Sequence, residues 1–395
     1  MDTPTTEQAT LDRHYMARAL GLADYGRFST DPNPRVGCVL VRDGREVGAG
    51  LHWLAGAPHA EVNALTAAGA AARGATAYVT LEPCSHHGRT PPCTGELIRA
   101  GVARVVIAMQ DPNPRVCGGG IAALREAGIE VTTGVLEEAA RALNPGFVRR
   151  MEHGRPWVRV KLAASLDGRT AMASGDSRWI TGEAARRDVQ LWRARAGAIL
   201  TGSGTVVTDD PRLNVRLQPG ALAAQAGFPE LPEVRDLSSR QPLRVILDAR
   251  LRTPPSAQIL RTGPVWVLTA PGMAQTPAAD ALRERGAEVR PVPLAQGRSE
   301  GGLDPGTVLQ ELGRAEINEL HVESGPGLAG ALARGGWVDE WLIYQAPLLL
   351  GSNARPLVEW PLAHMDERAE LEILESRWVG DSLRLRARPR PCPRP

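Results

Sequence analysis

Two stretches decide the fold of the first half of the chain: Pro-His-Ala-Glu at positions 58–61 and Glu-Pro-Cys-Ser-His-His-Gly-Arg-Thr-Pro-Pro-Cys at positions 82–93. His59 offers an imidazole, and Cys84 and Cys93 offer thiolates. This ligand set suits zinc and leaves a fourth position for water, as in catalytic zinc sites. Prolines stand just before the helical patterns at 60–72 and 94–100, so both ligand groups are predicted to lie where helices begin.

The acidic residue next to this ligand set indicates hydrolysis. Glu61 is too close to His59 in sequence to share the metal comfortably, yet it can reach a bound water and pass its proton to a leaving amine. Zinc deaminases of nucleobases combine His-x-Glu with a Pro-Cys element in this way. The alternative is a closed structural site with His86 or His87 as fourth ligand and Glu61 on the surface. Eight residues separate the cysteines instead of two, and this polar loop suits a phosphorylated ligand.

Composition restricts the class of protein. A chain of 395 residues predicts two domains, and 43% hydrophobic with 23% charged residues is typical of a globular protein. The net charge of +2 gives no basic excess for nucleic-acid binding, so we expect a small substrate. Five cysteines are few for this length and odd in number, which argues against a disulfide framework. Neither a signal peptide nor a membrane-spanning segment is visible. We therefore expect a cytoplasmic protein that binds neither nucleic acid nor membrane.

Alternating patterns predict an α/β fold in both halves. Apolar runs typical of strands occur at 36–41, 77–81, 105–109, 129–133, 158–164, 198–201, 243–247, 265–269, 319–323 and 340–345. Further helical patterns occur at 11–25 before the first of these runs, at 121–127 between the third and fourth, and at 136–143 after the fourth. A polar segment at 151–156 predicts the boundary between a domain at 1–152 and a domain at 156–387. Segments 218–240 and 291–305 are predicted surface loops, and 388–395 a disordered tail.

Three further features are open to more than one interpretation. Asn33, between two prolines, can present an amide to a pyrimidine edge or simply form a turn. Cys38 and Cys117 are expected to have no function. Gly-Pro-Gly-Leu-Ala-Gly at 325–330 follows a strand pattern and precedes a helical one, so it can hold a pyrophosphate or be only a tight turn. It lacks the acidic residue after the next strand that a Rossmann domain requires.

Together these motifs resemble the bifunctional deaminase/reductase family of riboflavin biosynthesis. The resemblance rests on 32–34, 59–61, 82–93 and 111–114, and in the second half on 161–171, 201–205, 209–211 and 323–330, and it covers about residues 11 to 385. It implies a cytidine-deaminase-like zinc domain followed by a dihydrofolate-reductase-like domain. The first would deaminate 2,5-diamino-6-(5-phosphoribosylamino)pyrimidin-4(3H)-one. The second would then reduce the ribosyl side chain to ribityl with NADPH, giving 5-amino-6-(5-phosphoribitylamino)uracil.

The resemblance also assigns residues. His59, Cys84 and Cys93 become the zinc ligands and Glu61 the proton shuttle. The residues that it places at the NADPH site are Ala163, Trp179, Thr205, Asp209, Gly325, Pro326, Gly327, Leu328, Ala329, Gly330 and Ala331. Those that we expect to contact substrate are Asn33, Lys161, Ser177, Arg193, Leu213, Arg216 and Glu323. We also expect a homo-oligomer, a dimer or a tetramer.

Lys161 is the one lysine beside 45 arginines. Our hypothesis is that a compact ammonium is needed near the ribosyl group or the nicotinamide, where a rigid guanidinium would not fit. The alternative is a chance survivor of an arginine-rich composition. Two other functions compete for the whole chain: a nucleic-acid deaminase of the tRNA-editing type, and a structural zinc module that regulates the reductase.

Overall fold

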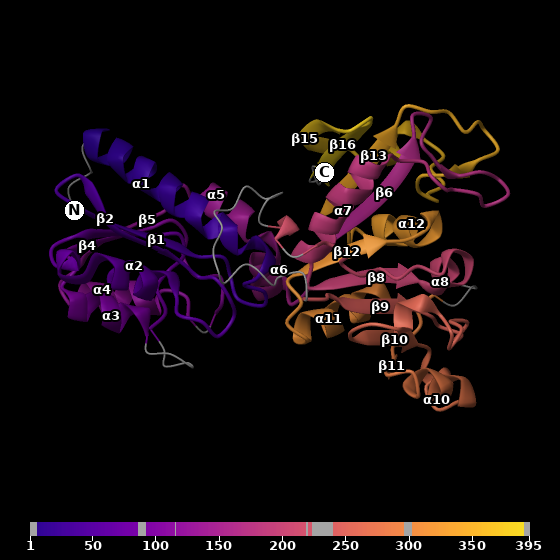
Figure 1. Cartoon of the computed structure of the whole chain (residues 1–395), viewed down its shortest axis with the longest axis horizontal. Helices are drawn as coiled ribbons and strands as arrows, with labels where there is room; N and C mark the ends of the chain where they lie inside the picture. The colour runs from indigo at the N-terminus through magenta and orange to yellow at the C-terminus, as the bar shows by residue number, and fades with distance from the viewer. Residues whose placement is uncertain are drawn as a thin grey trace. The chain divides into compact units, whose positions relative to one another are not determined.

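The computed structural model describes residues 6–85, 92–114, 116–218, 220–222, 240–295 and 302–390. The chain divides into two compact units, Met1–Gly154 and Arg155–Pro395 (Figure 1). None of the described helices is both long enough and apolar enough to cross a membrane.

The first unit is a five-stranded sheet covered by helices on both faces. Its strand order is β2-β1-β3-β4-β5, with β1 antiparallel to β2 and β3, and with β3, β4 and β5 parallel. The strands are β1 (Gly37–Arg42), β2 (Arg45–Leu51), β3 (Thr76–Val79), β4 (Arg104–Ile107) and β5 (Glu130–Thr133). Helices α1 (Thr6–Asp24) and α5 (Glu137–Leu143) lie on one face, and α2 (Ala60–Ala68), α3 (Cys93–Ala100) and α4 (Gly119–Glu126) on the other (Figure 1). Helix α6 (Pro145–His153) ends the unit.

Close packing of α2 on β2 fixes where the ligand helix begins. A Cβ atom at Gly50 would lie only 2.4 Å from the carbonyl oxygen of Ala60 and from the backbone nitrogen of Ala64. Glycine is therefore required for the strand to approach the first turn of α2 this closely. The approach holds His59 and Glu61 in place.

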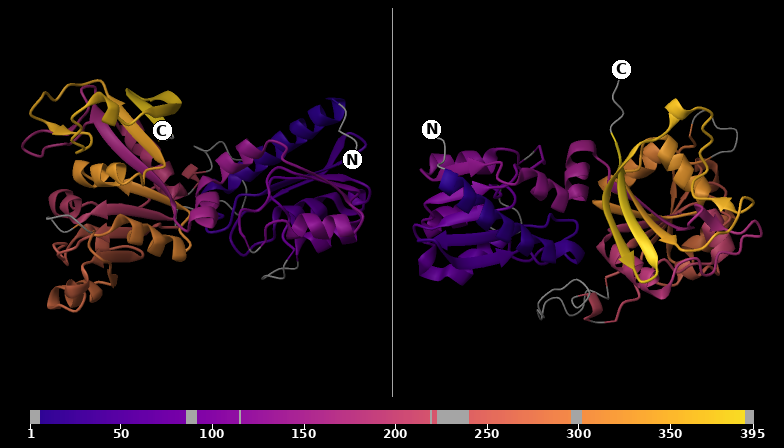
Figure 2. Two further views of the ribbon diagram at one scale, coloured as in Figure 1. Left: turned by 180° about the vertical axis from the view of Figure 1, so that it is seen from behind. Right: turned by 90° about the horizontal axis from the view of Figure 1, so that it is seen from above.

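The second unit contains a nine-stranded sheet in the order β11-β10-β9-β8-β12-β6-β13-β16-β15. The first seven strands in this order run parallel, and β15–β16 adds an antiparallel hairpin at one edge, yellow in Figure 2. The strands are β6 (Trp157–Ser165), β8 (Ala198–Gly202), β9 (Leu243–Leu247), β10 (Val265–Thr269), β11 (Ala287–Pro291), β12 (Glu319–Glu323), β13 (Glu340–Ala346), β15 (Leu371–Val379) and β16 (Ser382–Pro389). A separate pair joins β7 (Arg169–Ala171) to β14 (Arg355–Pro356).

Alternate residues of the central strands feed two separate cores. Leu200 and Val245 pack with α11 (Pro305–Arg314) and α12 (Pro326–Arg334) on one face. Ile199 and Ile246 pack with α8 (Ser203–Asp209) and α10 (Pro277–Arg283) on the other. Helix α7 (Glu183–Arg195) packs on β13. A parallel sheet buried on both faces explains why its strands appear as continuous apolar runs in the sequence.

All the predicted strands, and the helices predicted at 94–100, 121–127 and 136–143, are confirmed within two residues. Several expectations are wrong. The helix predicted at 11–25 begins five residues earlier, at Thr6. The pattern at 60–72 is an α-helix only to Ala68 and then a 3-10 turn. The polar boundary segment starts inside α6. Strands β2, β7, β11, β14, β15 and β16 were not predicted. Arg388 and Pro389 belong to β16 rather than to a disordered tail. Positions 391–395 and most of 218–240 lie outside the described residues.

Candidate active sites

Three ligand side chains converge in the first unit. His59 is the residue just before α2, Cys93 is the first residue of α3, and Cys84 lies in the loop after β3. The three ligand atoms lie within 4.8 Å of one another. His59 Nδ1 is 3.2 Å from Cys93 Sγ and 3.7 Å from Cys84 Sγ. Tetrahedral zinc with ordinary Zn–N and Zn–S bonds separates nitrogen from sulfur by about 3.6 Å, so these residues fit zinc.

The two thiols differ in acidity. The hydrogen bond from the Cys93 side chain, followed by that from His59, lowers the pKa of Cys84. The same contact and burial raise the pKa of Cys93. The backbone N–H of Cys93 also points at Cys84 Sγ, 3.4 Å away. Cys84 is therefore the sulfur that ionises first.

Glu61 lies in the first turn of α2 and is 3% exposed. Burial raises its pKa, and His59 counteracts this in part. A carboxylate with a raised pKa is a better proton acceptor than an ordinary one, which suits general acid–base catalysis. The alternative that Glu61 is a surface residue is wrong, while His86 and His87 lie outside the described residues.

A hydrogen-bonded pair orients Asn33 beside the ligand set. His52 is 3% exposed, and its Nδ1 lies 3.1 Å from the carbonyl oxygen of Pro58. Because a carbonyl only accepts, Nδ1 carries the proton and Nε2 accepts from Asn33 Nδ2 at 3.0 Å. The His52 ring also packs edge-on against His59 at 5.3 Å between centroids. The amide oxygen of Asn33 is thereby left for a ligand.

Glu82 is a buried carboxylate that sequence reasoning missed. It is 3% exposed and accepts backbone N–H groups of Asp111 (3.1 Å), Gly118 (3.1 Å), Gly120 (2.9 Å) and Ile121 (3.2 Å). It therefore joins the Cys84 loop to the segment that begins α4. The signal available in sequence was an acidic residue at the end of an apolar run, directly before Pro-Cys.

The second unit contains a cavity of about 730 Å³ toward the carboxyl ends of β6, β8 and β12. In open parallel sheets this edge is where ligands bind. Most of the predicted reductase residues line it together: Lys161, Ala163, Ser177, Trp179, Arg193, Thr205, Asp209, Leu213, Arg216, Glu323, Gly325, Pro326, Gly327 and Leu328.

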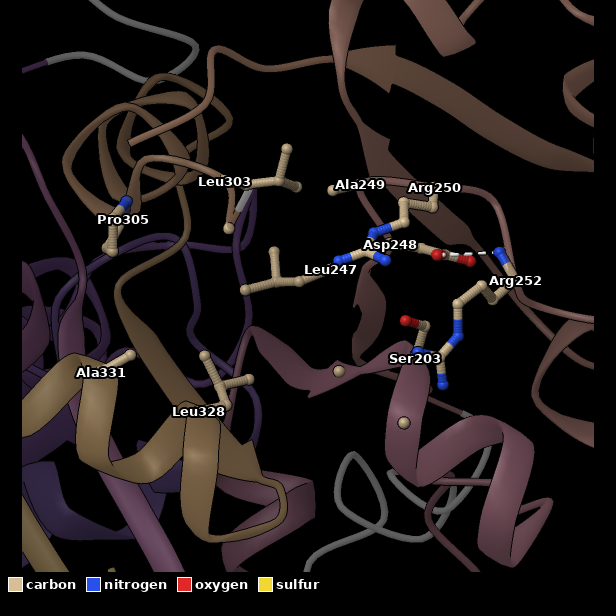
Figure 3. A pocket seen from close by; sticks show the side chains of 13 residues that line it. Ser203, Leu247, Asp248, Ala249, Arg250, Arg252, Leu303, Pro305, Leu328 and Ala331 are labelled. Carbon is tan, nitrogen blue, oxygen red and sulfur yellow. Dashed lines mark hydrogen bonds between the residues drawn. The ribbon is translucent and has the colours of Figure 1, made fainter. Parts of the chain in front are cut away.

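The end of the glycine-rich segment has a different place. Ala329 is fully buried in the core, and a Cβ atom at Gly330 would lie 2.1 Å from the carbonyl oxygen of Glu359. Gly330 is thus a packing glycine that points away from the cavity. Ala331 instead lines a smaller adjoining cavity (Figure 3).

A charged cluster forms the floor of the large cavity. Arg193 donates to both carboxylate oxygens of Glu323, at 2.5 and 2.9 Å, and to the carbonyl oxygen of Asn214 at 3.1 Å. Lys161 lies opposite Glu323 in the register of β6 and β12. Burial lowers the pKa of Lys161, and Glu323 opposes this. Arg193 is therefore committed to Glu323, whereas Arg216 at the rim is exposed.

A His-Cys-Cys set with a buried glutamate in one unit, and a large cavity at the strand ends of a second α/β unit, define a zinc deaminase fused to a reductase. Family models agree: residues 9–109 match the cytidine and deoxycytidylate deaminase zinc-binding region, and 156–383 match the RibD C-terminal domain. The chain is 50% identical to the riboflavin biosynthesis protein RibD of Escherichia coli over 371 residues, 93% of this chain and 97% of that protein. Its counterpart in Haemophilus influenzae is 46% identical over 97% of this chain and 99% of its own length.

Solved structures agree over the whole length. Acinetobacter baumannii RibD matches with a TM-score of 0.85 and 43% identity, covering 97% of this chain and 100% of that one. The deaminase/reductase of Thermotoga maritima matches with a TM-score of 0.79 and 32% identity, covering 96% and 99%. The chain belongs to the RibD family.

It is accordingly a bifunctional enzyme of riboflavin biosynthesis, which first deaminates and then reduces, with zinc and NADPH as cofactors. Both alternatives for the whole chain, the tRNA-editing type of deaminase and the regulatory zinc module, are therefore wrong.

Proposed function

We propose that residues 1–152 deaminate 2,5-diamino-6-(5-phosphoribosylamino)pyrimidin-4(3H)-one on a zinc ion held by His59, Cys84 and Cys93. Bound zinc supplies Lewis-acid activation of water. Glu61 would accept a proton from the attacking water, whose oxygen bonds to the ring carbon that carries the exocyclic amine. Glu61 would then deliver this proton to the amine nitrogen, whose bond to the same carbon breaks as ammonia leaves. The observation that carries the proposal is the buried Glu61 beside three converging ligand atoms. The Thermotoga maritima relative is itself named as a diaminohydroxyphosphoribosylaminopyrimidine deaminase.

Asn33 is the residue that we assign to the pyrimidine in this site. Its amide N–H is occupied by His52, so its oxygen accepts from an N–H or amino group of the ring. The free amide oxygen of Asn33 therefore favours a pyrimidine edge that donates a hydrogen bond. It also favours the pyrimidine interpretation of Asn33 over a simple turn.

We propose that residues 156–387 reduce the ribosyl side chain to ribityl in the large cavity. NADPH supplies the hydride. The residues that hold it are Ala163, Trp179, Thr205, Asp209 and the 325–331 segment, in which Ala329 and Gly330 act by packing. Ser177, Leu213 and the Arg193–Glu323 pair contact the substrate. The exposed guanidinium of Arg216, which also donates to the side chain of Asn214, suits the phosphate, and Lys161 supplies a proton.

The test follows ammonia and NADPH separately in the purified, zinc-loaded enzyme. Wild type should release ammonia from the diaminopyrimidine and then consume NADPH. Glu61→Gln should retain one zinc per chain, lose ammonia release, and still reduce the deaminated pyrimidine when this is supplied. Failure of both reactions in wild type, or full ammonia release by the variant, would contradict the proposal.

We also propose a cytoplasmic homo-oligomer, a dimer or a tetramer. Edge strand β15 exposes Ile373 (57%) and Trp378 (69%), a surface suited to a second copy of the chain. Thiol ligands are consistent with a reducing compartment. Light scattering on wild type and on Trp378→Glu would test the assembly, because a monomeric wild type contradicts it.

A further inference from the structure

An asparagine at the junction of α5 and α6 does not cap the helix that it precedes. Asn144 follows the last residue of α5 and stands directly before Pro145, the first residue of α6. An asparagine at this position ordinarily accepts a backbone N–H of the first helical turn with its side-chain oxygen. Across the described residues, the Asn144 side chain makes no such bond to α6. Its amide is therefore used elsewhere.

The Asn144 amide binds the main chain of Arg35 instead. The backbone N–H of Arg35 donates to Asn144 Oδ1 at 2.8 Å, and Asn144 Nδ2 donates to the backbone carbonyl oxygen of Arg35 at 2.9 Å. Both bonds are buried, and Asn144 itself is 5% exposed. The side chain thus takes both main-chain groups of one residue, as a neighbouring strand does in an antiparallel sheet. It fixes a residue that lies 109 positions earlier in the chain.

Two arginines strengthen this connection. Arg35 Nη1 donates to the carbonyl oxygen of Leu143, the residue before Asn144, at 2.5 Å. Arg150 of α6 donates from Nη2 to the carbonyl oxygen of Pro32 at 3.3 Å. Helix α6 and the residue before it therefore hold both ends of the segment 32–35. Asn33, which we assign to the pyrimidine, lies between these two ends.

The segment 32–35 is stiff, so its anchors decide where Asn33 points. Pro32 and Pro34 have fixed φ angles, and a residue that precedes a proline is restricted to extended backbone. The backbone N–H of Asn33 donates to the carbonyl oxygen of Thr30 at 2.8 Å. The Asn33 side chain contacts His52 through its Nδ2 atom, but this bond orients the amide and not the main chain. Releasing the anchor at Arg35 should therefore displace the whole segment.

We propose that Asn144 is a positioning residue for deamination. It fixes the main chain of the segment 32–35 so that the amide oxygen of Asn33 meets the pyrimidine. This inference rests on the proposed contact between Asn33 and the pyrimidine. Glu61 is held separately, in the first turn of α2. Asn144 therefore acts on the binding of the pyrimidine and not on proton transfer.

The experiment measures ammonia release by the zinc-loaded, full-length protein as a function of pyrimidine concentration. Asn144→Ser keeps a residue that caps a helix well but is too short to bridge both main-chain groups of Arg35. Its KM should rise about two- to tenfold, the range expected when one neutral hydrogen bond to the substrate is lost. The kcat should stay within about twofold of wild type, and each chain should still bind one zinc ion.

His153→Ser is the matched control, because His153 is an exposed residue at the other end of α6. It should keep the wild-type KM. The second unit supplies a control for folding, because Asn144→Ser should still reduce the deaminated pyrimidine with NADPH at the wild-type rate. An unchanged KM in Asn144→Ser would overturn the inference, as would a loss of kcat at constant KM.

A double-mutant cycle separates positioning from general destabilisation. In an Asn33→Ala background, Asn144→Ser should raise the KM no further, because both residues act through the same contact with the pyrimidine. A further rise as large as the one in the native background would overturn the inference.

Amide hydrogen exchange gives a second readout that needs no turnover. Peptides that cover 30–36 should lose protection in Asn144→Ser, whereas peptides that cover α2 should keep it. An equal loss in both would assign Asn144 to the stability of the whole first unit and would overturn the inference. Wild-type ammonia release, measured first, tests the proposed function independently of these variants.

Discussion

Glu82→Gln should loosen the deaminase site without removing any residue proposed to bind zinc or substrate. The native carboxylate accepts four backbone N–H groups in a buried position. A glutamine has one carbonyl oxygen, which can still accept the backbone N–H groups of Gly120 and Ile121. Its amide N–H₂ group then faces the backbone N–H groups of Asp111 and Gly118 and cannot accept from them. Each buried N–H left without an acceptor costs about 1–3 kcal/mol, so the free energy of unfolding of the first unit should fall by about 2–6 kcal/mol.

Amide hydrogen exchange measures this effect where it arises. Peptides that cover 111–121 should lose most of their protection in the variant, and Cys84, two residues from Glu82, should bind zinc more weakly. Glu126→Gln is the control, because Glu126 is an exposed residue at the end of the adjoining helix α4. If exchange at 111–121 and the urea midpoint of the first unit match those of the control, the carboxylate network does not hold the loop and the reasoning is refuted.

Three further changes test other parts of the two units. Burial would raise the pKa of Asp12, but hydrogen bonds from Arg104 outweigh burial and lower that pKa below its ordinary value. The ionised Asp12 therefore stabilises the folded protein above about pH 3.9, and this stabilisation is lost as the pH falls through the folded-state pKa. Asp12→Asn should therefore reduce the urea midpoint at pH 7 and match wild type in strong acid, and an equal deficit at both pH values would contradict this. His52→Ala should release Asn33 and raise the KM for the pyrimidine about two- to tenfold at constant zinc content, with little change in kcat; an unchanged KM would show that Asn33 needs no support. Lys161→Arg should slow reduction at saturating NADPH while ammonia release continues at the wild-type rate, and wild-type reduction would leave the chance-survivor interpretation standing.

The strands of the second unit could be predicted because the apolar run that marks each strand does not depend on which strands lie beside it in the sheet. Each central strand of the second unit is buried on both faces, so its own apolar run is sufficient. The β15–β16 hairpin differs, because one of its buried residues is charged and is neutralised by partners that are not its neighbours in the sequence. Arg384 is 5% exposed and is neutralised by Asp188 of α7 and Glu375 of β15. An arginine that pairs with residues 9 and 196 positions away in the chain cannot be recognised as buried from its neighbours, so the hairpin was not predicted.

The residues of the two active sites likewise fall into some that the sequence identifies and others that only the fold reveals. The zinc ligands have distinctive chemistry and stand beside helix-opening prolines, so their types and spacing are sufficient. Glu82 and His52 act on backbone groups that only the fold brings to them. Gly330 shows a packing role that the glycine-rich motif alone does not indicate, because a Cβ atom at this position would lie 2.1 Å from the backbone carbonyl oxygen of Glu359. Local sequence therefore shows which groups do chemistry and is silent on the groups that hold them.

The single lysine belongs to a layer of charged side chains on one face of the second sheet. Arg159 pairs with Glu319 and Glu340, and Arg193 occupies both oxygens of Glu323. Each guanidinium fork binds two oxygens and keeps its proton at any pH that the protein survives. Lys161 faces the cavity from the same layer, and burial lowers the pKa of its ammonium. The proton that we propose Lys161 to supply during reduction requires a lysine here, because an arginine at this place would hold its charge permanently.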